Sequence, residues 1–346
     1  MKIIRKILLL AIAVCGCHNA KGEDLKILQL NLWVQGQRVA GGSEAIIDIV
    51  DSTDADIVFL CEITGPRQRF LDYLSDELSK RGKYYCNDSL DLSMGILSKF
   101  KISSSTPCFR LDDHSRPNPV CKAEIKIGEN EIVLYSLHLD WTHYECYMPR
   151  GYSGTTWKKI PAPVENADSV LAANRLAFRE EGIAALLEDA DREISRGRMV
   201  ILGGDFNEPS HLDWQKDTKD IRDHNGLIID WDCSTMLMNA GFRDVYREQY
   251  PDPVTHPGFT FPAGNIYADI SSLTWLPDKD ERDRIDFIYY HPNRQLTLKN
   301  AWIIGPKDDI LYGKTYPSAT LDNIIEPAGI WPSDHKGIIA TFNISD

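Results

Sequence analysis

The chain has 346 residues, of which 43% are hydrophobic and 26% are charged, a balance typical of a soluble globular protein with a sizeable core. Its formal net charge is −13, and removal of Lys2, Arg5 and Lys6 with an N-terminal leader leaves 35 basic side chains against 51 acidic ones, or −16. A protein that neutralises many backbone phosphates needs a basic surface, so this charge disfavours extended DNA or RNA as a partner.

The first 22 residues are predicted to be an export signal. Three basic residues precede an apolar run, 7–14, which is too short to cross a bilayer as a helix. Val14-Cys15-Gly16-Cys17 then resembles a bacterial lipobox, in which Cys17 would be acylated and would attach the mature chain to a membrane. Plain cleavage after Ala20 or Gly22 is the alternative. We therefore expect a periplasmic or cell-surface lipoprotein or, alternatively, a secreted protein.

The remaining residues, 23–346, are predicted to form a single domain that acts as a monomer. No low-complexity stretch, long linker or repeat of fixed period interrupts residues 25–346. Six cysteines lie outside the leader, and none belongs to a CxxC pair or a Cys/His cluster with zinc-finger spacing. The pattern therefore does not indicate a structural zinc site.

Hydrophobic periodicity predicts a β-α-β-α opening. Residues 26–32 and 56–62 are apolar and rich in β-formers, whereas 43–50 and 67–80 have helical spacing. Short strand-like segments joined by turn residues follow and predict an antiparallel meander. These segments are 95–98, 101–110, 119–127 and 131–138.

The second half of the chain begins with one long predicted helix, 166–195, which ends before Gly197. A buried strand at 199–202 and three later strands follow, separated by long polar loops; the later strands are 284–290, 296–304 and 336–342. Mixed sheets with segregated helices predict an α/β (α+β) fold arranged as a layered sandwich.

Polar side chains stand where several of these apolar strands end. In Met199-Val-Ile-Leu-Gly-Gly-Asp205-Phe-Asn207, alternation places Asp205 and Asn207 on the same side, although this segment alone is equally compatible with a simple turn. The arrangement recurs at four other strand ends, and Ser333-Asp334-His335 precedes the last strand. The four are Gln29-Leu30-Asn31, Phe59-Leu60-Cys61-Glu62, Ser136-Leu137-His138 and Arg284-Ile285-Asp286.

In this order, these segments resemble the endonuclease/exonuclease/phosphatase superfamily, which includes pancreatic deoxyribonuclease, abasic-site endonucleases, bacterial sphingomyelinases and inositol-polyphosphate 5-phosphatases. The resemblance runs from Asn31 to His335, and Gly-Asp-Phe-Asn followed by Ser-Asp-His is its most specific part. It implies a four-layer α/β sandwich of two packed mixed β-sheets flanked by helices. It also implies a divalent-metal-dependent hydrolase of phosphate esters that acts by in-line attack of an activated water.

The resemblance further implies which residues bind the metal. Asn31 and Glu62 match the asparagine and glutamate of the family's metal site, with Glu62 as the direct ligand. Asp334 matches a further carboxylate, which acts directly or through water. This oxygen-rich set suits a hard cation such as Mg²⁺ or Mn²⁺.

The catalytic residues follow from the same resemblance. His335 matches the catalytic histidine, and Asp286 matches the carboxylate that fixes its tautomer and supports its charged form. His138 matches a second phosphate-facing histidine, whereas Asp205 and Asn207 match the pair that positions water and grips the phosphoryl group. The general base is either the aspartate at Asp205 or the His335–Asp286 pair.

One departure concerns the partner of His138. The deoxyribonuclease branch pairs this histidine with a glutamate on an earlier strand, but Asp91-Leu-Ser-Met-Gly-Ile offers no clear equivalent. The partner of His138 therefore stays open. His138-Leu-Asp140, followed later by the helical Asn174-Arg175, resembles the exported bacterial branch of the superfamily.

Two long loops supply candidate substrate contacts. Residues 141–165 follow a strand that carries a site residue and are rich in aromatic side chains, glycine and proline. We expect this stretch to form part of the pocket rim. The alternative is that the aromatic side chains of both loops simply pack inside the protein. The candidates are Trp141, His143, Tyr144 and Tyr147 in this stretch and Phe259, Tyr267, Trp275 and Arg282 in the loop 256–283.

The acidic charge and the export signal favour a small-molecule or lipid-headgroup phosphoester as the substrate. A secreted Mg²⁺-dependent nuclease with a local basic groove is the alternative. A catalytically silent surface binding module is a third possibility. Every landmark of the family is present, Glu62 and His335 included, which argues against loss of catalysis.

Cys108 and Cys121 flank a polar loop between two predicted strands. If these strands pair as a hairpin, the two cysteines face each other across its neck, at a separation that suits a disulfide. We therefore predict a bridge, with two free thiols as the alternative.

Overall fold

The computed structural model describes residues 22–63, 67–88, 93–109 and 120–345. Residues 1–21 of the predicted leader, which include Cys17, lie outside these residues, as does Asp91. Within the described part of the chain, no helix is both long and apolar enough to cross a membrane.

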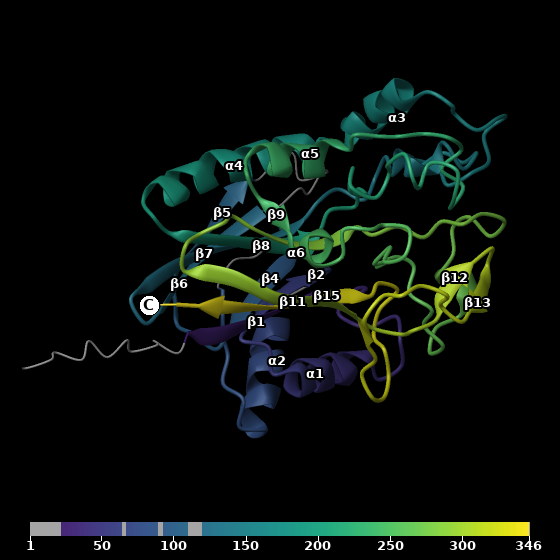
Figure 1. Cartoon of the computed structure of the whole chain (residues 1–346). Coiled ribbons are helices and arrows are strands. Elements are labelled where there is room, and N and C mark those ends of the chain that lie inside the picture. The colour runs from purple at the N-terminus through teal and green to yellow at the C-terminus, as the bar shows by residue number, and fades with distance from the viewer. Residues whose placement is uncertain (1–21, 64–66, 89–92, 110–119, 346) are drawn as a thin grey trace, which may run out of the picture.

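Two mixed β-sheets pack against each other, and helices cover their outer faces (Figure 1). One sheet has seven strands in the order β14-β11-β15-β1-β2-β4-β3, and the other has six in the order β5-β6-β7-β8-β10-β9. The first comprises β14 (Ile324–Ile325), β11 (Leu296–Ile304), β15 (Gly337–Ile344), β1 (Glu23–Asn31), β2 (Ile57–Cys61), β4 (Met94–Ser98) and β3 (Cys86–Asn87). The second comprises β5 (Ile102–Phe109), β6 (Val120–Ile127), β7 (Asn130–His138), β8 (Met199–Asp205), β10 (Asp286–Tyr290) and β9 (Arg243–Asp244).

Helices α1 (Gly42–Thr53) and α2 (Arg67–Lys80) pack on the seven-stranded sheet. Helices α4 (Arg179–Ser195) and α5 (Asp232–Asn239) pack on the six-stranded sheet. The predicted four-layer sandwich is therefore confirmed. The shorter elements are α3 (Ala167–Asn174), α6 (Val245–Gln249), the 3-10 turns Glu145–Tyr147, Arg175–Ala177 and Ile270–Ser272, and a small hairpin of β12 (Asp309–Leu311) and β13 (Lys314–Tyr316).

Strand alternation divides the apolar side chains among the layers. On β1, Leu25 and Ile27 enter the core between the two sheets, whereas Leu28 and Leu30 face the helices. The odd-numbered positions of β1 therefore point toward the six-stranded sheet. Gln29 and Asn31 continue this series, which is why they reach residues of the other sheet.

The predicted meander is only partly correct. Strands β5, β6 and β7 form an antiparallel meander, but β4 pairs with β2 and β3 in the other sheet. Each of these segments is apolar enough for a strand, and local periodicity does not say which sheet a strand joins.

The predicted long helix 166–195 is broken. It consists of α3, a 3-10 turn and α4, with Phe178 between them in the left-handed conformation (φ 56°). The break allows the buried Arg179 side chain to donate to the carbonyls of Asp140 (2.7 Å) and Thr142 (2.6 Å). These hydrogen bonds satisfy backbone carbonyls in the segment that follows β7. The need to satisfy these carbonyls outweighs the local preference for one continuous helix.

The predicted disulfide is wrong, although the two strands do pair. Cys121 lies opposite Pro107, and the register shifts between Pro107 and Phe109, so Cys108 occupies an irregularity in β5. The Cys108 side chain packs on the α4 side, whereas Cys121 points into the core between the sheets. The thiols therefore lie on opposite faces of the sheet and are not bonded to each other. Residues 110–119 of the intervening loop lie outside the described residues.

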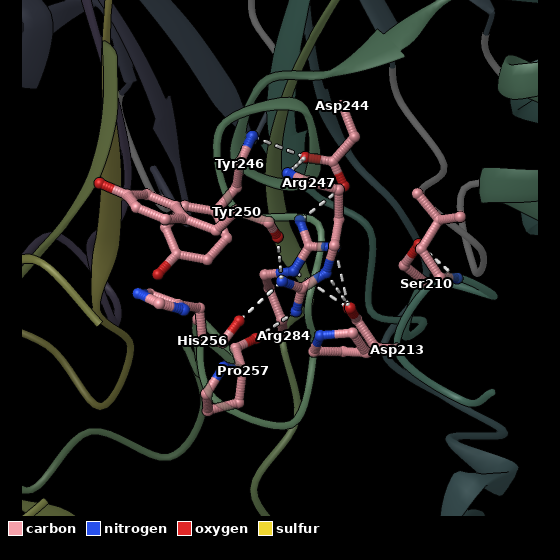
Figure 2. Close-up of polar contacts among 12 residues, drawn as sticks. Ser210, Asp213, Asp244, Tyr246, Arg247, Tyr250, His256, Pro257 and Arg284 are labelled. Carbon is pink, nitrogen blue, oxygen red and sulfur yellow. Dashed lines mark hydrogen bonds and ion pairs between the residues drawn. The ribbon is translucent and has the colours of Figure 1, made fainter. Parts of the chain in front are cut away.

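A buried network of ion pairs ties the start of β10 to the loops around it (Figure 2). Arg284 donates to Asp213 (3.0 Å) and to Asp244 (2.6 Å), and Arg247 donates to Asp213 (2.6 Å). Arg247 also binds backbone carbonyls of the following loop, those of Tyr250, His256 and Pro257. This network holds β10 in place just before Asp286.

Candidate active site

The strand ends singled out in the sequence meet at one end of the sandwich. In the six-stranded sheet, Asp205 pairs in register with His138 on one side and with Asp286 on the other. In the seven-stranded sheet, β1 and β2 are parallel and end together, at Asn31 and Cys61. The antiparallel strands β10 and β15 begin at this same end, which brings Asp286 and the segment before Gly337 to it.

His335 and Asp286 form a buried hydrogen-bonded pair, with 2.8 Å between His335 Nδ1 and Asp286 Oδ2. The Asp286 carboxylate also accepts from Gln29 Nε2 (2.9 Å), and its backbone N–H donates to Thr260 Oγ1 (3.1 Å). Burial by itself would lower the pKa of His335, but the carboxylates of Asp286 and Asp205 outweigh it and hold this pKa well above its usual value. The two carboxylates therefore favour the protonated form of the imidazole.

Asp205 lies between the two histidines. Its Oδ2 is 3.9 Å from Nε2 of both His138 and His335 and accepts from Asn31 Nδ2 at 2.8 Å. Its Oδ1 accepts from the backbone N–H of Asn207 at 2.8 Å. Burial, followed by the charge of the nearby Asp286, raises the pKa of Asp205 to about 6, against the opposing effect of the histidines. A carboxyl group with a pKa near neutrality suits proton transfer.

His138 and Asn207 border the site from the ends of β7 and β8. Among the described residues, which do not include 89–92, the contact of His138 Nδ1 is Ser93 Oγ at 3.5 Å. Asn207 is in the left-handed conformation (φ 47°), and its side-chain amide donates to the Leu139 carbonyl at 2.9 Å. This hydrogen bond fixes the orientation of the amide at the edge of the cavity.

Glu62 and Asp334 provide oxygen atoms that fit a divalent cation. Glu62 follows β2 in the left-handed conformation (φ 60°) and accepts from the Val34 N–H at 2.9 Å. Asp334 is buried, and its Oδ1 has no hydrogen-bond partner among the described residues. Burial first and the charge of Glu62 next raise the pKa of Asp334 to about 7, against the effect of His335. A cation would satisfy the orphaned oxygen and offset the repulsion between the carboxylates.

The Asn31 side chain links Glu62 to Asp205. Its Oδ1 accepts from the Trp33 N–H (2.9 Å), which directs its Nδ2 toward Glu62 (3.3 Å) and Asp205. A second group, Asp205 with Asp286 and His335, also places ligand atoms within 4.8 Å of one another. The cationic form of His335 would repel a metal there, so Glu62 and Asp334 fit a cation better.

Most of these residues line a cavity of about 630 Å³, whereas Asn31, Asp205 and Asp286 are not among its lining residues. Aromatic side chains form much of its wall. The lining residues are Glu62, Ser93, His138, Asn207, Asp334 and His335 near the strand ends, the aromatic residues Trp33, Trp141, Tyr144, Tyr147, Trp157, Phe261 and Trp275, and Val34, Arg38 and Ile285.

Some of the predicted substrate contacts line the cavity, and others do not. Trp141, Tyr144, Tyr147 and Trp275 line the cavity.

His143 and Arg282 are not among the residues that line it, and their roles as substrate contacts stay predictions. The His143 ring contacts Thr155 Oγ1 (3.0 Å), whereas Arg282 pairs with Asp280 (2.7 Å) and Asp309 (3.0 Å) and lies over the Phe259 ring. Both side chains stabilise loops rather than face the cavity. Phe259 and Tyr267 are likewise absent from its lining.

Sequence reasoning missed several supporting residues. Gln29 had a usable signal, because it lies two positions before Asn31 on the same face of β1. Thr260 and Trp157 belong to long loops without periodicity, so their positions followed only from the tertiary structure.

A four-layer α/β sandwich with histidines and carboxylates at one end defines the class of this protein. Residues 28–335 match the Endonuclease/Exonuclease/phosphatase family, and the chain belongs to this family. Its members are usually metal-dependent hydrolases of phosphodiester bonds, and they include phosphoesterases and nucleases such as TDP2.

Similar proteins come from animals and bacteria. The uncharacterized protein F14F9.5 of Caenorhabditis elegans is 26% identical over 296 residues, covering 82% of this chain and 85% of that protein. The structure of D. rerio TDP2 complexed with a single strand DNA product matches with a TM-score of 0.52 and 17% identity, covering 92% of this chain and 99% of that one. A functionally unknown conserved protein from Enterococcus faecalis V583 matches with a TM-score of 0.52 and 15% identity, covering 93% and 100%. At these identities the structural matches indicate a shared fold.

Proposed function

We propose that this protein is a divalent-metal-dependent hydrolase of a small-molecule or lipid-headgroup phosphoester. The observation that carries the proposal is one cavity lined by His138, His335, Glu62 and Asp334. The Asp205 carboxylate lies 3.9 Å from both of these histidines. A phosphoester is anionic, so its attack by water requires a cation, a proton acceptor and hydrogen-bond donors to the phosphoryl oxygens. This set of side chains supplies the acceptor, the donors and a place for the cation.

Glu62 and Asp334 would hold Mg²⁺ or Mn²⁺, which when bound neutralises charge that develops on the phosphoryl group. His335 is held as a cation by Asp286, so it donates a hydrogen bond to a phosphoryl or leaving oxygen. Asp205, with a pKa of about 6, is ionised at neutral pH and accepts the proton of the attacking water. Of the two candidates for the general base, Asp205 would take the proton of the water, whereas the His335–Asp286 pair would donate a hydrogen bond.

The cavity favours a small substrate over a nucleic acid. Among the described residues that line it, Arg38 is the one arginine or lysine. A nuclease needs several cations along the phosphate backbone, and the chain as a whole carries a formal charge of −13. Nuclease activity would therefore contradict the proposal of a small substrate.

A panel of phosphomonoesters, phosphodiesters and plasmid DNA, assayed with Mg²⁺ or Mn²⁺ and with excess chelator, tests the proposal. We expect hydrolysis of small phosphoesters that stops in chelator and returns with added metal. Glu62→Gln should weaken this metal dependence, whereas Glu129→Gln, at a side chain that is 98% exposed, should not. Full activity in chelator would contradict the metal-dependent mechanism, and preferential cleavage of the plasmid would contradict the small substrate.

We also propose, from the leader and its Val14-Cys15-Gly16-Cys17 segment, that the protein is exported and attached to a membrane by a lipid on Cys17. Mass spectrometry of the mature N-terminus in cells that process lipoproteins tests this. A lipid-modified Cys17 that is lost in Cys17→Ser supports the proposal. An unprocessed Met1, or an unlipidated N-terminus after Ala20 or Gly22, contradicts it.

A further inference from the structure

Three tryptophans form a continuous aromatic wall beside the catalytic residues. Trp141 follows β7 directly, Trp157 lies later in the same loop, and Trp275 belongs to the loop 256–283. The rings of Trp141 and Trp157 are stacked, with centroids 5.3 Å apart and 11° between the planes. Trp157 and Trp275 are 5.1 Å apart at 31°. All three line the cavity that contains His138 and His335.

Trp157 is partly buried and packs against a hydrophobic cluster, but Trp141 and Trp275 do not belong to the core. Trp141 is 52% exposed and Trp275 is 46% exposed, whereas Trp214 and Trp231 are fully buried. Two large apolar rings beside a catalytic cavity therefore remain open to solvent. Exposed aromatic surface that is concentrated at a cavity is typical of ligand contact.

The protein holds the wall in position through contacts between its two loops. Arg150 and Asp283 form a buried ion pair (2.6 Å), and the Tyr147 hydroxyl donates to Glu281 (2.9 Å). Closer to the tryptophans, Lys159 pairs with Asp278 at 2.7 Å. The aromatic surface is thus arranged before substrate binds, which lowers the entropy cost of binding.

We infer that this tryptophan wall, Trp141 with Trp157 and Trp275, binds a planar aromatic ring in one ester group of the substrate. The inference rests on the proposed phosphoesterase function and specifies its substrate class: an aryl or nucleoside phosphoester whose phosphoryl group lies at His138, Asp205 and His335. Flat π-surfaces stack on tryptophan faces, which favours a planar ring over an aliphatic chain of similar size. The cavity of about 630 Å³ suits one such group.

Titration calorimetry on the Mg²⁺-loaded protein tests the inference with three non-hydrolysable probes. Phenylphosphonate carries a planar ring, cyclohexylphosphonate a ring of similar size without a π-face, and methylphosphonate neither. We expect phenylphosphonate to bind more tightly than both other probes. Because stacking of one ring contributes a factor of about 5 to 150 in affinity, Trp141→Ala and Trp275→Ala should each weaken phenylphosphonate binding by roughly tenfold and leave methylphosphonate binding unchanged.

Trp302→Ala is the matched control, because Trp302 is 39% exposed on β11 and does not line the cavity. It should change the affinity of neither probe. Equal binding of phenylphosphonate and cyclohexylphosphonate, or an equal loss for phenylphosphonate and methylphosphonate in the tryptophan variants, would overturn the aromatic subsite alone. No Mg²⁺-dependent binding of any phosphonate, together with no hydrolysis of any phosphoester, would overturn the proposed function as well.

Discussion

Replacing Arg284 with methionine removes a charge shared by Asp213 and Asp244 while keeping a side chain of similar length. The Arg284 side chain is fully buried, and its guanidinium lies 3.0 Å from the first carboxylate and 2.6 Å from the second (Figure 2). Removal of one partner of a buried ion pair costs about 3–5 kcal/mol, because a charge stays buried without compensation.

The contacts that remain place this variant at the lower end of that range. Asp213 keeps Arg247 at 2.6 Å, and Asp244 keeps the N–H groups of Tyr246 (2.9 Å) and Arg247 (3.3 Å). We therefore expect Arg284→Met to lower the free energy of unfolding by about 3 kcal/mol. At about 1.5 °C per kcal/mol for a chain of this size, the melting temperature should fall by roughly 4–5 °C.

Urea unfolding followed by tryptophan fluorescence at pH 7 measures this loss. Arg192→Met is the control, because Arg192 is 52% exposed and pairs with Glu188 and Asp189 on the surface of α4. Exposed pairs contribute about 0–1 kcal/mol, so the control should lose little. The reasoning is refuted if the two variants lose the same stability. Asp244→Asn, added to Arg284→Met, should recover part of the loss because it removes an uncompensated charge.

Three further predictions concern catalysis, pH and packing. His335→Ala and Asp205→Asn should each lower kcat by about two orders of magnitude or more with little change in the urea midpoint; near-normal turnover in either variant would show that its role is misassigned. Burial raises the pKa of Glu180 from 4.5 to about 7, so the stability present below pH 4.5 is lost as the pH rises to about 7. Glu180→Gln should reduce this loss of stability by about 1 kcal/mol, a value that allows for solvent screening. If the urea midpoint shifts equally between pH 4 and pH 8 in the variant and the parent protein, Glu180 is not the cause of the loss. In Gly204→Ala the new Cβ would lie 1.9 Å from the Leu137 carbonyl oxygen, so thermal unfolding should reveal a loss of about 1–3 kcal/mol, and an unchanged melting temperature would contradict the close packing of β7 and β8.

The periodicity of the sequence by itself predicted a layered α/β sandwich, and the resemblance to the family implied its four layers and the residues of the site. Strand alternation and the polar residues at strand ends are local signals, and the order of the Gly-Asp-Phe-Asn and Ser-Asp-His segments adds specificity. In the structure these ends meet because Asp205 pairs in register with His138 and Asp286. Parallel strands end at the same edge of a sheet, and their antiparallel neighbours begin there. The positions of polar residues at strand ends were therefore sufficient to predict that these residues meet.

Only the tertiary structure decided the features that depend on contacts between distant segments. The helix breaks at Phe178 because Arg179 satisfies carbonyls at the end of another strand, and Cys108 faces away from Cys121 because β5 is irregular. Arg282 is directed to Asp280 and Asp309 rather than to the cavity. The three tryptophans of the cavity wall come from two loops without periodicity. Each of these features depends on contacts between side chains that are distant in the sequence, and hydrophobic periodicity contains no information about such contacts.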